Sequence, residues 1–246
     1  MTEDRSILTR AATAPDEIVA YGAEPEHVAD VRHAGERGAR RPLVVLIHGG
    51  FWRPAFDRAH TGPMAAALAG AGWTVASIEY RRAPTVPDHT IDDIGWALES
   101  LPANIRDHDG RVVVMGHSAG GHLALWAASK RPVPELCAAL ALAPVADLQL
   151  AHALNLGGGA VLAFLSVEPE ERADLDPRWM PPPAIPTTIV HGEADEVVPL
   201  SVSQSYVADH PEVRLVKLPA AGHFALIDPL SEAWPAVVGE LERLSS

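Results

Sequence analysis

Residues 111–126, Arg-Val-Val-Val-Met-Gly-His-Ser-Ala-Gly-Gly-His-Leu-Ala-Leu-Trp, decide the fold. The apolar residues 112–115 predict a buried strand, and the pattern of residues 121–130 predicts a helix directly after it. Between them, Gly116-His117-Ser118-Ala119-Gly120 has the form Gly-x-Ser-x-Gly, which in this setting places a serine on a sharp strand-to-helix turn. Small flanking residues let strand and helix approach, so Ser118 is predicted to stand clear of the sheet beside the free N–H groups of the helix.

Further apolar runs predict the rest of a sheet. Residues 43–47 and 136–143 are continuous apolar runs, which are typical of strands buried on both faces of a parallel sheet. Strands are also predicted at 73–80, 187–191 and 213–218, with one or two edge strands in 18–34, and helices at 64–71, 91–101, 200–209 and 229–244. This alternation predicts an α/β fold, a doubly wound and mostly parallel sheet with helices on both faces.

Residues 145–185 interrupt the alternation. They contain Gly157-Gly158-Gly159, an apolar helical piece at 161–165 and Pro181-Pro182-Pro183. We expect one domain over residues 1–246, with this stretch as a small cap insertion over the sheet. Two domains divided near Ala143 are the weaker alternative, because the candidate site residues come from both halves. Residues 1–17 are polar and are expected to form a mobile or surface-draped arm.

Composition limits the partners. The chain has 246 residues, of which 48% are hydrophobic, and a formal net charge of −13, which repels nucleic acid and anionic membranes, so we expect neither as a partner. Cys137 is the only cysteine, so no intrachain disulfide forms, and we expect it to pack in the core. The first residues lack the form of a signal peptide and no apolar run reaches membrane-spanning length, which predicts a soluble cytoplasmic protein.

A serine hydroxyl is a poor nucleophile unless a base and an orienting carboxylate activate it. The part of the chain that follows Ser118 offers one candidate for each role. Asp195 follows the predicted strand 187–191, and His223 follows the last predicted strand. Open α/β sheets place their sites at these strand ends, and the chain order Ser, acid, His fits the turn motif. We therefore assign Ser118, Asp195 and His223 as the candidate catalytic residues.

We expect the other acidic residues and histidines near these positions to have structural and not catalytic roles. Glu193 and Glu196 flank Asp195 as solvated loop charges, and Asp195 is preferred because Val197-Val198-Pro199 fixes the inward side of the loop. Asp228 is expected to cap the last helix. His117 and His122 are expected to point away from Ser118, and His191 to pack. The histidines expected at the surface are His27, His33, His60, His89, His108, His152 and His210. No metal is expected, because no His-Glu-x-x-His or close ligand cluster occurs.

The stretch His48-Gly49-Gly50-Phe51 follows the strand at 43–47. Acyl transfer builds negative charge on the carbonyl oxygen, and inward-turned backbone N–H groups stabilise it. Gly49, Gly50 and Phe51, with the amide of Ala119, are predicted to supply two or three such donors. A plain Gly-Gly turn is the alternative.

With these pieces assembled, the chain resembles the α/β-hydrolase superfamily over nearly all its length. His48-Gly49-Gly50-Phe51-Trp52 resembles the His-Gly-Gly-x-Trp signature of kynurenine formamidases (arylformamidases), and residues 116–122 are similar to their nucleophile segment. Tyr80-Arg81-Arg82-Ala83-Pro84 resembles the Tyr-Arg-Leu-Ala-Pro stretch of hormone-sensitive-lipase-like esterases. Those esterases have His-Gly-Gly-Gly, and here Phe51 replaces the third glycine.

The resemblance implies a serine hydrolase that needs no cofactor and acts on a small-molecule ester or amide. The main expectation is an arylformamidase of tryptophan catabolism that releases formate from N-formylkynurenine, and the alternative is a short-chain carboxylesterase. Trp52 and Phe51 are expected to offer an aryl substrate an aromatic face, with packing beside the loop as the alternative for Trp52. Phe164 and Trp179 of the cap are expected to complete the pocket. A non-catalytic binding protein is a distant alternative, because such proteins usually lack a triad member and none is missing here. A homodimer is left open.

Overall fold

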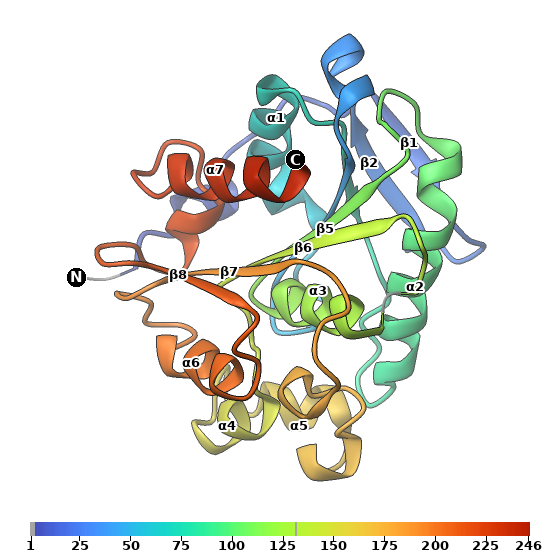
Figure 1. The fold of residues 1–246 in the computed structure, drawn as a ribbon. Coiled ribbons are helices and arrows are strands. Elements are labelled where there is room, and N and C mark those ends of the chain that lie inside the picture. Colours follow the sequence, from blue (N-terminus) through green and yellow to red (C-terminus); the bar gives the residue numbers. More distant parts are fainter. Residues whose placement is uncertain (1–2, 131) are drawn as a thin grey trace.

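The computed structural model describes residues 3–130 and 132–246. Eight strands form one sheet in the order β1-β2-β4-β3-β5-β6-β7-β8 (Figure 1). All neighbours from β4 to β8 run parallel, whereas β1 and β2 pair antiparallel at one edge. The strands are β1 (Glu17–Ala20), β2 (Val28–Arg32), β3 (Leu43–Ile47), β4 (Val75–Ile78), β5 (Val112–His117), β6 (Leu136–Leu142), β7 (Thr187–Gly192) and β8 (Arg214–Leu218).

Helices cover both faces of the sheet, which confirms the predicted architecture. In Figure 1, α1 and α7 lie above the sheet and α2, α3 and α6 below it. The α-helices are α1 (Gly62–Ala71), α2 (Pro87–Asn104), α3 (Ala119–Lys130), α4 (Leu148–Ala153), α5 (Ala160–Leu165), α6 (Leu200–Asp209) and α7 (Trp234–Ser245). Single 3₁₀ turns are η1 (Ser6–Thr9), η2 (Gly35–Arg40), η3 (Arg58–Thr61), η4 (Pro169–Arg172), η5 (Pro177–Trp179) and η6 (Phe224–Ile227).

The register of the central strands brings the predicted loops together. Every residue of β3 and β5 is buried, as expected for strands covered on both faces. Ile47 of β3 pairs with Gly116 of β5, so the loops that follow these strands leave the sheet side by side. Gly192 of β7 pairs with Leu218 of β8, so the loops that carry Asp195 and His223 also begin at one level.

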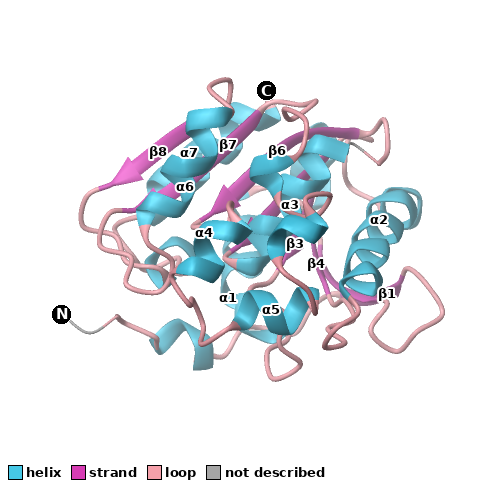
Figure 2. Cartoon of the chain, turned by 90° about the horizontal axis from the view of Figure 1, so that it is seen from below, coloured by secondary structure: helices cyan, strands magenta, loops and turns pink. Residues whose placement is uncertain are grey.

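Residues 145–185 lie between β6 and β7 and carry α4, α5, η4 and η5. Figure 2, seen from below, shows α4 and α5 on the side of the sheet that α3 occupies. Phe164 and Val161 of α5 belong to the same core cluster as Leu123 of α3, so this segment is packed onto the main body.

Several element boundaries differ from the sequence expectation. The helix predicted at 91–101 runs over Pro87–Asn104, because a proline fits the first helical turn and does not prevent the start at Pro87. The last helix begins at Trp234 and not at 229. Strand β4 covers only Val75–Ile78 of the predicted 73–80. Among the described helices, none has the length and apolar character needed to cross a membrane.

Candidate active site

Ser118 lies at the turn between β5 and α3, as the motif predicts. Its φ of 57° is in the left-handed region, which an L-residue adopts only at a cost of about 1–3 kcal/mol. The turn is held by the Ser118 amide, which donates to the Leu142 carbonyl at 2.8 Å, and by the Ser118 carbonyl, which accepts from the His122 amide at 3.0 Å. A β-carbon at Gly120 would collide with the carbonyl oxygen of Ile47, so only glycine lets α3 pass this close to β3.

Asp195 and His223 come together. The His223 Nδ1 atom lies 2.7 Å from Asp195 Oδ2, and both side chains are buried. The other carboxylate oxygen, Oδ1, accepts from the amides of Val197 and Val198 at 2.8 and 2.7 Å. Burial alone would raise the pKa of Asp195, but hydrogen bonds from His191 and His223 outweigh it and hold this pKa well below its ordinary value. The carboxylate is therefore ionised and can orient the His223 ring.

Two histidines expected to have no part in the site contact these residues. His191 Nε2 lies 2.8 Å from the Val198 carbonyl and 3.4 Å from Asp195 Oδ2, so this ring supports the loop of Asp195. The prediction that His117 points away from the site is wrong. Its ring centroid lies 4.4 Å from that of His223, and its Nε2 lies 3.1 Å from the His223 carbonyl. Burial and the neighbouring His223 lower the pKa of His117 well below its ordinary value, so it donates to that carbonyl as a neutral imidazole.

Residues 48–52 form the loop predicted to bind an oxyanion. Gly49 lies against the serine, because a β-carbon there would be 3.0 Å from Ser118 Cβ. Phe51 and Trp52 have φ of 52° and 54°, so the loop turns through two consecutive left-handed residues. Within the described chain, the amides of all four predicted residues, Gly49, Gly50, Phe51 and Ala119, donate to no protein acceptor, and the Ala119 amide opens α3. These amides are the candidate oxyanion donors.

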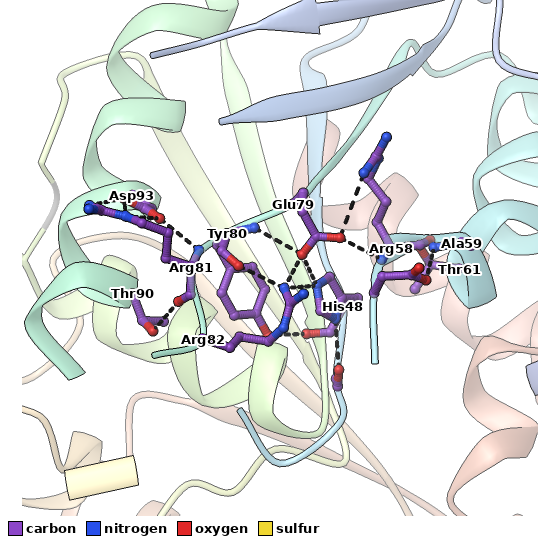
Figure 3. Close-up of polar contacts among 12 residues, drawn as sticks. His48, Arg58, Ala59, Thr61, Glu79, Tyr80, Arg81, Arg82, Thr90 and Asp93 are labelled. Atoms are coloured by element: carbon purple, nitrogen blue, oxygen red, sulfur yellow. Dashed lines mark hydrogen bonds and ion pairs between the residues drawn. The ribbon is translucent and has the colours of Figure 1, made fainter. Parts of the chain in front are cut away.

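A network of charged side chains holds residue His48 at the start of the 48–52 loop (Figure 3). His48 Nδ1 lies 2.7 Å from the Gly49 carbonyl, and His48 Nε2 lies 3.0 Å from Glu79 Oε1. Glu79 forms ion pairs with Arg82 and with Arg58, and the Tyr80 hydroxyl donates to the His48 carbonyl at 2.9 Å. Burial would raise the pKa of Glu79, but hydrogen bonds and charges from His48 and Arg82 lower it to about 2.

The chain is similar to known hydrolases. A family model described as serine hydrolase matches residues 89–243, more than half of the chain. The chain belongs to the serine hydrolase family. A second model, BD-FAE, matches residues 29–143. These two matches together span both the His-Gly-Gly loop and the loops of Asp195 and His223.

Two of the relatives of this chain are esterases by name. Esterase LipC of Mycobacterium tuberculosis is 27% identical over 85% of this chain, and esterase LipQ of the same organism is 28% identical over 70% of it. The chain spans only 60% and 46% of the length of these two proteins. Phosphonate-inhibited esterase B from Lactobacillus rhamnosis has a TM-score of 0.76 at 21% identity, with 95% of this chain and 88% of that one covered. The last likeness confirms the α/β-hydrolase fold.

Ser118 and His223 line one cavity of the serine hydrolase, with a volume of about 270 Å³. Within the described residues, no hydrogen bond joins the two side chains; such bonds are often long before substrate binds. The full lining consists of Arg5, Leu8, Gly50, Phe51, Arg53, Phe56, His60, His117, Ser118, Gly157, Val197, His223 and Phe224. Burial lowers the pKa of His60 to about 4, so this wall residue is neutral at pH 7.

Three aromatic residues predicted to contact substrate lie elsewhere. Trp52 is 4% exposed and stacks on Phe164 with ring centroids 4.6 Å apart, so both belong to the core. Trp179 is 53% exposed and does not line the cavity. Trp52 therefore packs in the core, which is the alternative expected for it, and does not contact the cavity. Phe51 is the aromatic residue of this motif that lines the cavity.

Other expectations also need correction. Asp228 does not cap the last helix but forms an ion pair with Arg10. Residues 3–10 are therefore attached to the body, which agrees with the surface-draped alternative for this segment. His27 and His210, expected at the surface, are buried, and His27 Nε2 lies 2.8 Å from Asp93. Cys137 is only partly buried. No group of three His, Cys, Asp or Glu side chains suited to a metal ion occurs in residues 3–130 and 132–246.

Proposed function

We propose that this protein is a serine carboxylesterase that cleaves small-acyl esters through Ser118, His223 and Asp195. One observation carries the proposal: Ser118 and the Asp195-bound His223 line the same 270 Å³ cavity. The names of LipC and LipQ support an ester as the substrate. The cavity lies at the small end of ligand pockets, which supports a short acyl group.

The side chains divide the reaction as follows. Ser118 Oγ attacks the ester carbonyl carbon while His223 Nε2 takes the hydroxyl proton, because Nδ1 already faces Asp195. The carbonyl oxygen becomes an oxyanion beside the amides of Gly50, Phe51 and Ala119. His223 then gives its proton to the leaving alkoxide, which departs as the alcohol, and Ser118 carries the acyl group. A water molecule, deprotonated by His223, attacks the acyl carbon and restores Ser118 with release of the acid.

An arylformamidase is the second candidate function, and the aromatic lining of the cavity supports it. Phe51, Phe56 and Phe224 all line the cavity, and aromatic walls favour an aryl substrate by about 0.5–1.5 kcal/mol per ring pair. Formyl is the smallest acyl group, which also suits the volume. The comparisons favour the esterase, so the formamidase stands second.

A substrate panel tests the proposal. We expect a fluorophosphonate to label Ser118, and 4-nitrophenyl acetate and butyrate to be hydrolysed faster than N-formylkynurenine. Preferential turnover of N-formylkynurenine would move the protein to the arylformamidases. A protein that neither reacts with fluorophosphonate nor turns over any ester or formamide would refute the serine hydrolase activity.

A further inference from the structure

Residues 3–10 place two side chains in the candidate active site. Glu3 Oε1 accepts from the Phe224 amide at 3.1 Å, directly after His223. Ile7 is 1% exposed and belongs to the core cluster with α1 and α7. Arg10 Nη2 donates to Asp228 Oδ2 at 2.8 Å. Arg5 and Leu8, held among these three attachments, line the cavity that contains Ser118.

The charge of this cavity is opposite to that of the protein. The chain carries 32 acidic and 19 basic residues, yet no Asp or Glu is part of the lining. The lining contains two arginines, Arg5 and Arg53. The nearby carboxylates of Glu3 and Asp4 line a separate surface groove next to this cavity. A cleft with one sign of charge concentrates ligands of the other sign, so this cavity favours an anion.

Neither arginine is neutralised by a carboxylate of the described chain. Arg5 Cζ lies 5.5 Å from the ring centroid of Phe224, a cation–π contact that leaves its N–H groups free. Arg53 donates to the Gly157 carbonyl, and its Cζ lies 5.9 Å from the Phe51 ring. A guanidinium presents a planar fork of donors that matches a carboxylate in a bidentate geometry.

The position of Arg5 identifies which part of a substrate it meets. The leaving group of an ester lies beside the histidine that protonates it. The Phe224 ring lies 5.0 Å from the His223 ring and also contacts the Arg5 guanidinium, so Arg5 belongs to the part of the cavity wall that contains His223. Of the two ends of an ester, the leaving group is therefore the one that we expect to lie closer to Arg5.

We propose that the substrate is a small ester whose leaving group carries a carboxylate, and that Arg5 is the residue that selects it, with Arg53 adding to the positive charge of the cavity. The inference rests on the proposed esterase function and specifies its substrate class. Both arginines are exposed, so each contact is solvent-screened and the expected selectivity is modest, roughly three- to tenfold.

Matched esters test the inference with the full chain. The first pair is 4-acetoxybenzoate and the neutral 4-acetoxybenzamide, and the second pair places the charge on the acyl side, phenyl hydrogen succinate against phenyl 4-oxopentanoate. Each kcat/KM is divided by the alkaline hydrolysis rate of the same ester, which removes differences in leaving-group chemistry. We expect the corrected ratio of benzoate to benzamide to be roughly three- to tenfold at low ionic strength and to shrink at high salt.

Three variants locate the effect. Arg5→Gln is expected to bring the benzoate-to-benzamide ratio close to one, and Arg53→Gln to lower it less. The matched control is Arg106→Gln, which removes the same charge from a side chain that is 79% exposed and outside the cavity, and it should keep the wild-type ratio.

The outcomes separate the inference from the function. Turnover of 4-acetoxybenzamide with no preference for the benzoate would overturn the inference and leave the esterase intact. Equal effects of Arg5→Gln and Arg106→Gln, or a preference confined to the acyl-side pair, would also overturn the role of Arg5. Absence of turnover for every ester, with no fluorophosphonate labelling, would overturn the esterase proposal and this inference with it.

Discussion

Asp195 Oδ2 lies 2.7 Å from His223 Nδ1, although the two residues are 28 positions apart and follow different strands. The pairing of Gly192 in β7 with Leu218 in β8 fixes this distance, because it starts both loops at one level of the sheet. The His223 tautomer follows from it: Nδ1 carries the proton that faces the carboxylate, which leaves Nε2 for the proton of Ser118 in the proposed mechanism.

Replacing Ser118 by Ala should remove esterase activity by several orders of magnitude, because the groups of a triad act as a unit. Steady-state hydrolysis of 4-nitrophenyl acetate and fluorophosphonate labelling measure the loss. The far-UV circular dichroism should match that of the wild type. Residual activity within about tenfold of wild type would show that another nucleophile acts.

Asp195→Asn should lower kcat by about 10⁴-fold, because an amide no longer fixes the tautomer of His223. Glu193→Gln and Glu196→Gln provide matched controls on the same loop, since both side chains are exposed. They should retain nearly full kcat. Similar losses in all three variants would mean that Asp195 is not the orienting carboxylate.

Glu79→Gln should destabilise the protein by about 3–5 kcal/mol and lower kcat, because it leaves Arg82, whose side chain is 9% exposed, without its anion and loosens the support of His48. Urea unfolding and steady-state kinetics measure the two effects. Asp88→Asn is the control, since its ion pair with Arg172 involves a carboxylate that is 64% exposed and should cost less than about 1 kcal/mol. Equal destabilisation by the two variants would contradict the role of Glu79.

Stability should fall as the pH drops from about 6.5 to about 4. Burial lowers the pKa of His122 to about 4, whereas its unfolded value is about 6.5. In this window His122 binds a proton in the unfolded chain but stays neutral in the folded protein. The free energy of unfolding therefore falls by up to about 1.4 kcal/mol for each unit that the pH drops. His122→Gln should show a shallower loss in urea midpoints across the window than wild type. The exposed His89→Gln is the control, and an unchanged slope in His122→Gln would refute the assignment.

Phe51→Gly should widen the acyl specificity. Phe51 lines the cavity at a φ of 52°, where glycine is unstrained, so the substitution removes a ring without disturbing the loop. In the wild type, kcat/KM for 4-nitrophenyl esters should fall beyond roughly four acyl carbons, by about 1–3 kcal/mol per misfit methylene. The variant should shift the optimum to longer chains. An unchanged chain-length profile would show that Phe51 does not border the acyl group.

The sheet and the candidate triad could be predicted because their signals are local. Continuous apolar runs such as residues 43–47 indicate doubly covered strands, and β3 is wholly buried. Asp195 and His223 follow such strands, and parallel strands bring their carboxyl ends to one edge of the sheet. The strained turn at Ser118 is likewise encoded by two neighbouring glycines.

The supporting contacts could not be predicted, because each joins distant segments. Glu79 meets His48 across 31 positions, and Asp228 meets Arg10 across 218. Trp52 packs in the core against Phe164, 112 positions later, and the cavity-facing Phe51 is its immediate neighbour. Sequence patterns show which residues are apolar or charged, but not which distant residue each one contacts. The residues that line the cavity depend on these long-range contacts, so substrate contacts are the least predictable part of the site.

The attachment of Glu3 to Phe224 joins the first described residues to the segment that follows β8. This contact spans 221 positions, so it can form only once that segment has been synthesised. Until then, the wall of the cavity contributed by Arg5 and Leu8 lacks its partner. The complete cavity therefore appears only after β8 has left the ribosome, and a nascent chain released before that point would hold the serine turn without a working site.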